Sequence, residues 1–341
     1  MIKIEINDNG IFSDLFRYPS PESNAELSIV IPTWNRVDHL SALLNYLEKE
    51  LASCSDLVTR IDFYVIDNAS EDGTKEIVAQ SKVPIIYRRH DHNIGGDKNI
   101  FWAYSEPKTS YVWVIGDDDL PNEGALLRTV DLLHEHRPGL LVLSHNIHAW
   151  TQLGQRYGGH KFSNYRDFIE NGFISEFALM EHSLISSNIV HLGNFDQALN
   201  VAIQPYTFYP HMYAISGGLL KSGESVLFSP DVIFNGQYVV HSDDVFDKMY
   251  NQYNSQKNRI KPQVARSLVE WYAWVLLQTE HPSAIAFAIA FLWRIHSGTA
   301  FFDVNAAFAL TPLRRFGDTI CRHLGKLICL ALNRQRQVLS R

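Results

Sequence analysis

Between residues 27 and 145, short runs of apolar and β-branched residues alternate with longer stretches in which apolar residues recur every three or four positions. The short runs predict strands and the longer stretches predict helices. We expect strands at residues 27–31, 61–66, 85–87, 111–115 and 140–143, and helices at 37–51, 74–80, 98–104 and 123–136. This alternation is typical of βαβ units, so it predicts an α/β fold with a mainly parallel sheet and helices on both faces.

The pattern weakens after residue 145. Residues 146–250 are richer in Gly, Asn, Tyr, Phe and His, and they predict loops, short helices and a few strands. Helical periodicity returns at residues 264–278, 283–296 and 313–333. We therefore expect four parts: an extension at 1–25, a first half at 26–145, a second half at 146–261, and a helical region at 262–341.

A polar cluster follows four of the predicted strands. These clusters occupy residues 32–36, 67–70, 93–99 and 116–119. In a parallel sheet the carboxyl ends of the strands meet at one edge, where ligands bind against loops and helix N-termini. We expect the four clusters to form one composite site.

Asp117, Asp118 and Asp119 carry the strongest chemical signal. Three consecutive carboxylates repel one another unless a cation lies among them, and Mg²⁺ or Mn²⁺ prefers such oxygen ligands. The alternative is a solvated acidic turn that caps the next helix. The residues alone leave both interpretations open.

Two further clusters have the chemistry of a nucleotide site. Asp67 is placed to accept an N–H from a nucleobase, although Asn68 and Ser70 suit a plain turn equally well. The Gly-Gly pair before Lys98 allows close backbone approach by a phosphate, and here too a plain turn is the alternative.

In this order and spacing the clusters resemble the family-2 glycosyltransferases, inverting enzymes of the GT-A fold that use nucleotide-activated sugars. The resemblance rests on SIVIPTWNR at residues 28–36, VIDNASEDGT at 65–74, Asn93-Ile94-Gly95 with Lys98-Asn99, and WVIGDDD at 113–119. It covers residues 26–145. The Gly-Asp-Asp-Asp form looks most like the abequosyltransferase-like branch, which builds bacterial O-antigen and related surface polysaccharides.

The resemblance implies a role for each of these clusters. The residues expected to contact the nucleotide are Thr33, Trp34, Asn35, Arg36, Asp67, Lys98, Asp117 and Asp118. Asp119, together with Asp117, would hold Mn²⁺ or Mg²⁺. Residues 26–145 would thus bind the nucleotide sugar, and residues 146–261 would bind the acceptor and supply the catalytic base.

The base of the donor nucleotide follows from Asp67. An ionised carboxylate accepts from the N3–H of uracil or thymine, whereas N3 of cytosine has no proton to donate. The sequence therefore favours a UDP- or dTDP-sugar, although abequosyltransferase-like relatives use CDP-sugars.

An inverting transfer also needs a base for the acceptor hydroxyl. Asp244 matches the family's position for it, and Asp243 stands where the family more often has Glu. The alternative is that both residues cap a short helix. Asp231 is the reserve candidate. His211 and the Gly217-Gly218 pair suit core or turn positions better than an acceptor site.

Charge is unevenly distributed along the chain. The net charge is −7, but residues 312–341 carry +6 and the rest carries −13. An acidic body argues against nucleic-acid binding. Residues 313–341 predict a basic amphipathic helix that lies on an anionic membrane or packs on the protein. The resemblance favours the membrane, because relatives extend glycans on polyprenyl-diphosphate carriers.

Other features concern the compartment and the rival functions. Three cysteines, no signal-like N-terminus and no apolar run of spanning length predict a cytoplasmic protein, peripheral on the inner face of the membrane. One rival function is a catalytically silent sugar-nucleotide-binding scaffold. Another is a nucleotidyltransferase, which should carry a Gly-rich basic loop where this chain has residues 32–36.

Overall fold

The computed structural model describes residues 12–16, 25–146, 158–173, 182, 184–203, 209–235, 271, 274–275 and 278–279. The chain divides into two compact units, Met1–Pro205 with Pro210–Asn251, and Tyr206–Tyr209 with Gln252–Arg341. The predicted helices at 283–296 and 313–333 and the aspartates at 243 and 244 lie outside the described residues. Within the described part, no helix has the length and apolarity that crossing a bilayer requires.

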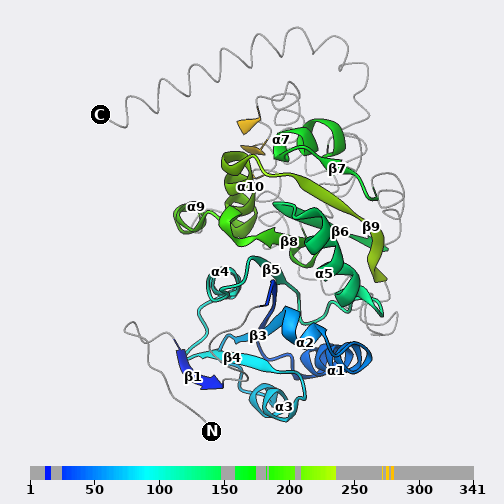
Figure 1. The fold of residues 1–341 in the computed structure, drawn as a ribbon. Coiled ribbons are helices and arrows are strands. Elements are labelled where there is room, and N and C mark those ends of the chain that lie inside the picture. Colours follow the sequence, from blue (N-terminus) through cyan, green and yellow to red (C-terminus); the bar gives the residue numbers. More distant parts are fainter. Residues whose placement is uncertain are drawn as a thin grey trace, which may run out of the picture. The chain divides into compact units, whose positions relative to one another are not determined.

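In the first unit, the described residues form one nine-stranded sheet in the order β1-β4-β3-β2-β5-β8-β6-β9-β7 (Figure 1). The strands are β1 Phe12–Phe16, β2 Leu27–Thr33, β3 Ile61–Asp67, β4 Ile85–His90, β5 Tyr111–Val114, β6 Leu140–Asn146, β7 Lys161–Phe162, β8 Asn188–His191 and β9 Val226–Asn235. The helices are α1 Val37–Ser53, α2 Leu57–Arg60, α3 Thr74–Gln80, α4 Gly96–Ser105, α5 Ala125–His136, α7 Tyr165–Asp167, α9 Gln197–Ile203 and α10 Pro210–Ser222, with short turns η2 Phe168–Phe173, η3 Ile185–Ser187 and η4 Leu192–Asn194. All five predicted strands and four predicted helices of residues 27–145 are present.

The strands β4, β3, β2 and β5 are adjacent and parallel, as the alternating pattern predicts. Side chains of successive strand residues point to opposite faces. Leu27, Ile29 and Ile31 of β2 pack in one cluster with Leu43 and Leu47 of α1. Helix α4 packs against the same strands without joining that cluster, so helices cover both faces of this part of the sheet. Burying each such aliphatic side chain contributes about 1.5–3 kcal/mol.

Antiparallel pairing joins the second half to the first. Strand β8 lies between β5 and β6 and runs antiparallel to both. Strand β9 then pairs parallel with β6, and the edge strands β1 and β7 are antiparallel to their neighbours. The sheet is therefore mixed, with its parallel core in the first half.

The loop between β5 and α5, which carries the three consecutive aspartates, is anchored by α1. The carboxylate of Glu50 accepts from Gly124 N at 2.9 and 3.1 Å, and Tyr46 donates to Asn122 O at 2.8 Å. Burial raises the pKa of Tyr46, and the nearby Glu50 raises it further. Helix α1 thus positions this loop from its far end.

The second half has a buried polar network at its centre. The Tyr165 hydroxyl lies 2.8 Å from His182 Nε2 and 2.9 Å from Ser216 Oγ, and His182 Nδ1 lies 2.6 Å from Asn188 Oδ1. All four side chains are fully buried. Gly218 lies so close to η4 that a Cβ atom would meet Asn194 O at 1.8 Å.

Three positions that the sequence assigned to core or turn are buried in this region. His211, Gly217 and Gly218 all lie on α10 and have buried side chains or backbones. Their prediction as core residues is confirmed.

In the second unit, the described residues 271, 274, 275 and 278 are helical, which agrees with the predicted helix at 264–278. Trp271 and Val275 are fully buried, and Thr279 donates its hydroxyl to Val275 O at 3.1 Å.

Candidate active site

The carboxyl ends of β2, β3 and β4 are in register. Thr33 is paired with Asp67, and Asp67 with Arg89. A parallel sheet brings such positions to one edge because its strands share a direction. A polar cluster follows each of these strands, as the sequence predicts.

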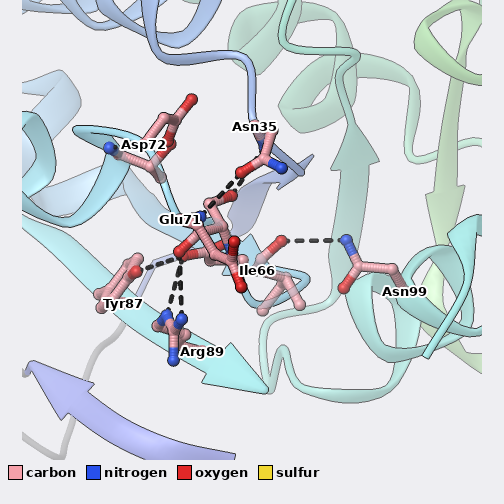
Figure 2. A network of polar contacts seen from close by, with 10 residues as sticks. Asn35, Ile66, Glu71, Asp72, Tyr87, Arg89 and Asn99 are labelled. Atoms are coloured by element: carbon pink, nitrogen blue, oxygen red, sulfur yellow. Dashed lines mark hydrogen bonds and ion pairs between the residues drawn. The ribbon is translucent and has the colours of Figure 1, made fainter. Parts of the chain in front are cut away.

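A polar network that includes Tyr87 and Arg89 lies at this edge (Figure 2), and both residues contact Asp67. Its side chain is fully buried, Tyr87 donates to Oδ2 at 2.5 Å and Ser70 N donates to Oδ1 at 2.8 Å. Arg89 Nε lies 3.5 Å from Oδ2, and the same guanidinium donates to Ser70 O at 3.1 Å. The carboxylate therefore orders the turn that follows β3, and its contact with a nucleobase stays a prediction.

Two hydrogen bonds tie the first polar cluster to the second. Asn35 N donates to Ser70 Oγ at 2.9 Å, and Glu71 N donates to Asn35 Oδ1 at 2.8 Å. Asn35 and Ala69 both have positive φ, 51° and 63°, a conformation that costs energy for residues with a side chain. These bonds hold both turns in place, and Figure 2 shows the Asn35 side chain reaching the backbone at Glu71.

The third cluster is joined to the second through Asn68. Its Nδ2 donates to Asn93 Oδ1 at 3.0 Å, and Ile94 N donates to its Oδ1 at 2.8 Å. Gly95 has a φ of 90°, and a Cβ atom there would meet nothing within 4 Å. The loop backbone is thus open where the sequence predicts approach by a phosphate.

Helix α4 begins at Gly96, two residues before the predicted start. Lys98 therefore lies in its first turn, and its side chain is exposed. Asn99 donates to Ile66 O at 3.1 Å and joins α4 to the end of β3 (Figure 2).

Asp117 connects the first cluster to the fourth. Thr33 donates to its Oδ2 at 2.8 Å and Arg36 to its Oδ1 at 2.8 Å, and the side chain is 3% exposed. Burial raises the pKa of Asp117 to about 6, against the opposing effects of Arg36 and Thr33. A carboxylate held this far from water needs the cation beside it to stay ionised.

Arg36 contacts two of the three aspartates. Its second guanidinium nitrogen lies 2.5 Å from Asp118 Oδ2. Burial alone would lower the pKa of Arg36, but Asp118, Asp117 and Asp119 raise it overall. Three carboxylates and one guanidinium leave a formal charge of −2 in this cluster.

Asp119 is held from the second half of the sheet. Ser186 of η3 donates its hydroxyl to Asp119 Oδ2, and Gly116 N donates to the same hydroxyl at 2.9 Å. A Cβ atom at Gly116 would lie 3.0 Å from both Asp118 Oδ1 and Asp119 Oδ2. A side chain at Gly116 would therefore crowd both carboxylates.

Two other predicted residues have a described environment. Trp34 is 50% exposed, which suits a flat side chain that stacks on a ligand. Asp231, on β9, is bonded through Oδ2 to Arg128 Nε of α5 at 2.6 Å, and both side chains are about half exposed. Asp243 and Asp244 lie outside the described residues.

The three aspartates offer the kind of oxygen ligands that a divalent cation prefers. Within the described residues, no group of three or more His, Cys, Asp or Glu side chains is already arranged around a metal position. The donor set nevertheless fits, because all three acidic side chains offer hard oxygen ligands and a divalent cation would balance the formal charge of −2.

Comparison with known proteins agrees with this geometry. Residues 28–184 match the family described as Glycosyl transferase family 2. The abequosyltransferase RfbV of Salmonella typhimurium is 37% identical over 97 residues, which are 27% of this chain and 28% of that protein. The match to this curated relative therefore spans little more than a quarter of its length.

Solved structures of low sequence identity share the fold. S. aureus TarS 1–349 in complex with UDP-GlcNAc has a TM-score of 0.50 at 16% identity, over 80% of this chain and 88% of that one. The same protein in complex with UDP has a TM-score of 0.50 at 14% identity, over 81% and 93%. Residues 28–184 of this chain thus resemble glycosyltransferase family 2 in sequence, and the fold is GT-A, as the four strand-end motifs predict.

Proposed function

We propose that this protein transfers one sugar from a nucleoside-diphosphate sugar to a hydroxyl of a bacterial surface glycan, with inversion at the anomeric carbon and with Mn²⁺ or Mg²⁺ as cofactor. The observation that carries the proposal is the strand-end cluster in which Thr33 and Arg36 hold Asp117, beside Asp118 and Asp119, within the residues that match family 2. The likeness to RfbV supports a sugar transferase of surface-glycan synthesis.

The charge of the cluster supports metal dependence. Asp119, together with Asp117, would hold the cation, whose charge stabilises the diphosphate as it leaves. The single positive charge of Arg36 cannot neutralise three carboxylates. Without a divalent cation, the remaining negative charge would repel a diphosphate. Lys98, exposed at the start of α4, is a second cation for the nucleotide.

The donor is a UDP- or dTDP-sugar in this proposal. Thr33 and Trp34 line the base and ribose, and Asp67 accepts the base N3–H. Among the described residues, Oδ1 of Asp67 accepts one hydrogen bond, from Ser70 N, and a carboxylate oxygen can accept two. The Asp67 side chain is fully buried in this structure, so its contact with the base has to be tested directly. Binding of nucleotides that differ only in the base is the deciding measurement.

The chemical step needs a base on the acceptor side. Asp244 takes the proton of the acceptor hydroxyl while the hydroxyl oxygen forms a bond to the anomeric carbon. The bond between that carbon and the diphosphate breaks on the opposite face of the sugar. Asp243 lies beside it in the chain. Such a base contributes about 10²- to 10⁴-fold to the rate. Asp231 is the weaker candidate because its carboxylate is bonded to Arg128.

The acceptor is a polyprenyl-diphosphate-linked glycan, and residues 313–341 bind the anionic inner face of the cytoplasmic membrane. The seven basic residues of this segment support that partner. Sedimentation with anionic phospholipid vesicles tests it, by comparing the full chain with a variant that ends at residue 312. Equal sedimentation of both would overturn membrane binding by this segment.

Thermal stability with nucleotides tests the donor site. The full chain is melted with UDP, dTDP, CDP and GDP, each with Mn²⁺ and with chelator. A nucleotide at about 100 times its Kd adds about 2.7 kcal/mol, a shift of a few degrees for a chain of this length. A shift that needs Mn²⁺ and is largest for UDP or dTDP supports the proposal, and a preference for CDP corrects the donor.

Asp244→Asn separates the enzyme from the silent scaffold. We expect the variant to bind nucleotide as the wild type does and to lose transfer by about 10²-fold or more. Anomeric analysis of the wild-type product by NMR tests inversion. Nucleotide binding without any transfer by the wild type, over a panel of donors and acceptors, favours the scaffold instead.

A further inference from the structure

Ser186 is hydrogen-bonded through its hydroxyl and through its backbone carbonyl to β5 and to the loop that carries the aspartates. Its hydroxyl donates to Asp119 Oδ2 and accepts from Gly116 N at 2.9 Å. Its carbonyl oxygen accepts from Trp113 Nε1 at 2.8 Å. The residue is fully buried, so water cannot replace any of these bonds.

The direction of the hydroxyl proton follows from these partners. A serine hydroxyl has one proton, and a backbone N–H and an ionised carboxylate can only donate and accept respectively. Gly116 N–H therefore takes a lone pair of the Ser186 oxygen, and the proton points at Asp119 Oδ2. A hydrogen bond to a charged oxygen is about twice as strong as a neutral one, so it restrains rotation of this carboxylate.

The position of Ser186 is set by the second half of the sheet. Strand β8 follows η3 directly and is antiparallel to β5, with Ile189 paired to Trp113. Asn188 Nδ2 donates to Leu184 O at 2.7 Å and closes the η3 turn from the inside. The pairing of β8 with β5 thus places the Ser186 hydroxyl of the second half beside the Asp119 carboxylate of the first half.

We propose that Ser186 is a positioning residue that orients the Asp119 carboxylate for the divalent cation, a proposal that rests on the proposed function. Groups that hydrogen-bond to a metal ligand fix its orientation, and their loss typically weakens metal binding by about 10- to 100-fold. The metal affinity of the donor site is then set in part by η3, a turn from outside the four strand-end motifs.

Ser187→Ala is a matched control for Ser186→Ala. Ser187 is the next residue in η3 and is also fully buried, and its Oγ has no hydrogen-bond partner in the part of the chain that the structure describes. Both variants lose one buried oxygen. Only Ser186→Ala loses the bond to Asp119.

The measurement is Mn²⁺ binding to the full chain, followed by the EPR signal of free Mn²⁺ with and without UDP. We expect about 10- to 100-fold weaker Mn²⁺ binding for Ser186→Ala, an affinity within about twofold of wild type for Ser187→Ala, and recovery in Ser186→Thr, which keeps the hydroxyl. Melting in chelator should be alike for both alanine variants.

The outcomes separate this proposal from the function on which it rests. Wild type that binds no Mn²⁺ defeats the metal-dependent function, whereas wild type and Ser186→Ala that bind it equally overturn only the role of Ser186. If Ser186→Ala does not fold, Gly116→Ala replaces it. The added Cβ atom would lie 3.0 Å from Asp119 Oδ2 and would push this oxygen out of its position beside Ser186. An unchanged Mn²⁺ affinity in that variant overturns the proposal as well.

Discussion

The two halves of the sheet are specified in different ways. Residues 27–145 form repeated strand-helix units whose apolar positions recur regularly, and many small hydrogen bonds link the strand ends. Residues 158–235 combine elements of two to seven residues with the longer α10 and β9, and they rely on a few buried side chains such as Tyr165 and His182, each with several partners. Redundant small contacts tolerate the loss of one member, whereas a buried network does not.

The candidate active site uses both kinds of construction. The four polar clusters are joined in a series from Asn93 through Asn68 and Asn35 to Arg36 and the aspartates. The last bond of that series comes from Ser186 in the second half. If the comparison holds, substitutions should cost more stability in the second half than in the first.

Gly218→Ala should have the largest effect. Its Cβ atom would lie 1.8 Å from Asn194 O and 2.4 Å from Asn194 C, so the backbone of α10 or η4 has to move. Overpacking of this kind costs about 1–3 kcal/mol and more where backbone is the obstacle, so we expect at least about 3 kcal/mol. Urea unfolding measures the loss.

Gly96→Ala is the control in the first half. A Cβ atom there meets nothing within 4 Å, and the residue opens α4. Alanine in a helix is favoured over glycine by up to about 1 kcal/mol. An equal loss in both variants would contradict the difference between the halves.

The first half was predictable because its pattern is local. The helix at 74–80 matches at both ends, and the strand beginning at residue 61 extends one residue beyond its predicted end, to Asp67. Strand β4 runs three residues further than the apolar run 85–87, because Arg88, Arg89 and His90 continue its pairing with β1 and β3 and their side chains have polar partners. Apolar periodicity cannot show that polar residues continue a strand.

The remaining part of the site was out of reach for a different reason. Arg36 and Asp117 each lie in a recognisable motif, and the structure brings them together. Ser186 lies 67 residues after Asp119 in a stretch without periodicity, and a single serine beside a four-residue strand carries no signal. Tyr87 and Arg89 had a partial signal, since polar residues at the end of an apolar strand lie near the ligand edge.

A fall in pH should also affect the second half most. Burial lowers the pKa of His182 to about 4, against the opposing hydrogen bond of Asn188. An unfolded histidine titrates near about 6.5, so between these values the unfolded chain binds a proton that the folded chain does not. The free energy of unfolding therefore falls as the pH drops from about 6.5 to 4, by about 3 kcal/mol for this group.

Urea unfolding of wild type and His182→Gln over this pH range measures that loss. The variant starts less stable, but its stability should change less with pH. Burial lowers the pKa of His211 to about 3, so some acid sensitivity remains. His134→Gln, at an exposed position on α5 beside Glu26, is the control for loss of a histidine outside the network. A wild-type slope in His182→Gln would show that the buried network is not the source.

Tyr87→Phe should have a smaller effect, at the centre of the first half. It removes the hydroxyl that donates to Asp67, while Ser70 N and Arg89 still contact the carboxylate. Loss of one hydrogen bond to a buried charge costs about 1.5–3 kcal/mol, and the remaining partners favour the lower end.

Tyr104→Phe is the matched control for that loss. Tyr104 is also fully buried, and its hydroxyl has no hydrogen-bond partner among the described residues. Its removal should be neutral or slightly stabilising in urea unfolding. A cost for Tyr87→Phe as high as that of Gly218→Ala would remove the distinction between redundant and concentrated contacts.

Glu50→Gln should have the smallest effect, although Glu50 is 5% exposed and anchors the loop that carries the aspartates. The amide oxygen of glutamine can still accept from Gly124 N, so the variant loses one of the two acceptor contacts and the attraction of a negative charge to the start of α5. That attraction is worth about 0.3–1 kcal/mol. Urea unfolding should show this loss, and Glu76→Gln, exposed in the first turn of α3, should show a smaller one, because solvent screens its attraction to the helix start. A loss above about 2 kcal/mol in Glu50→Gln would mean that the loop depends on one charge, as the second half depends on its buried network. The hydrogen bonds at the strand ends would then not be redundant.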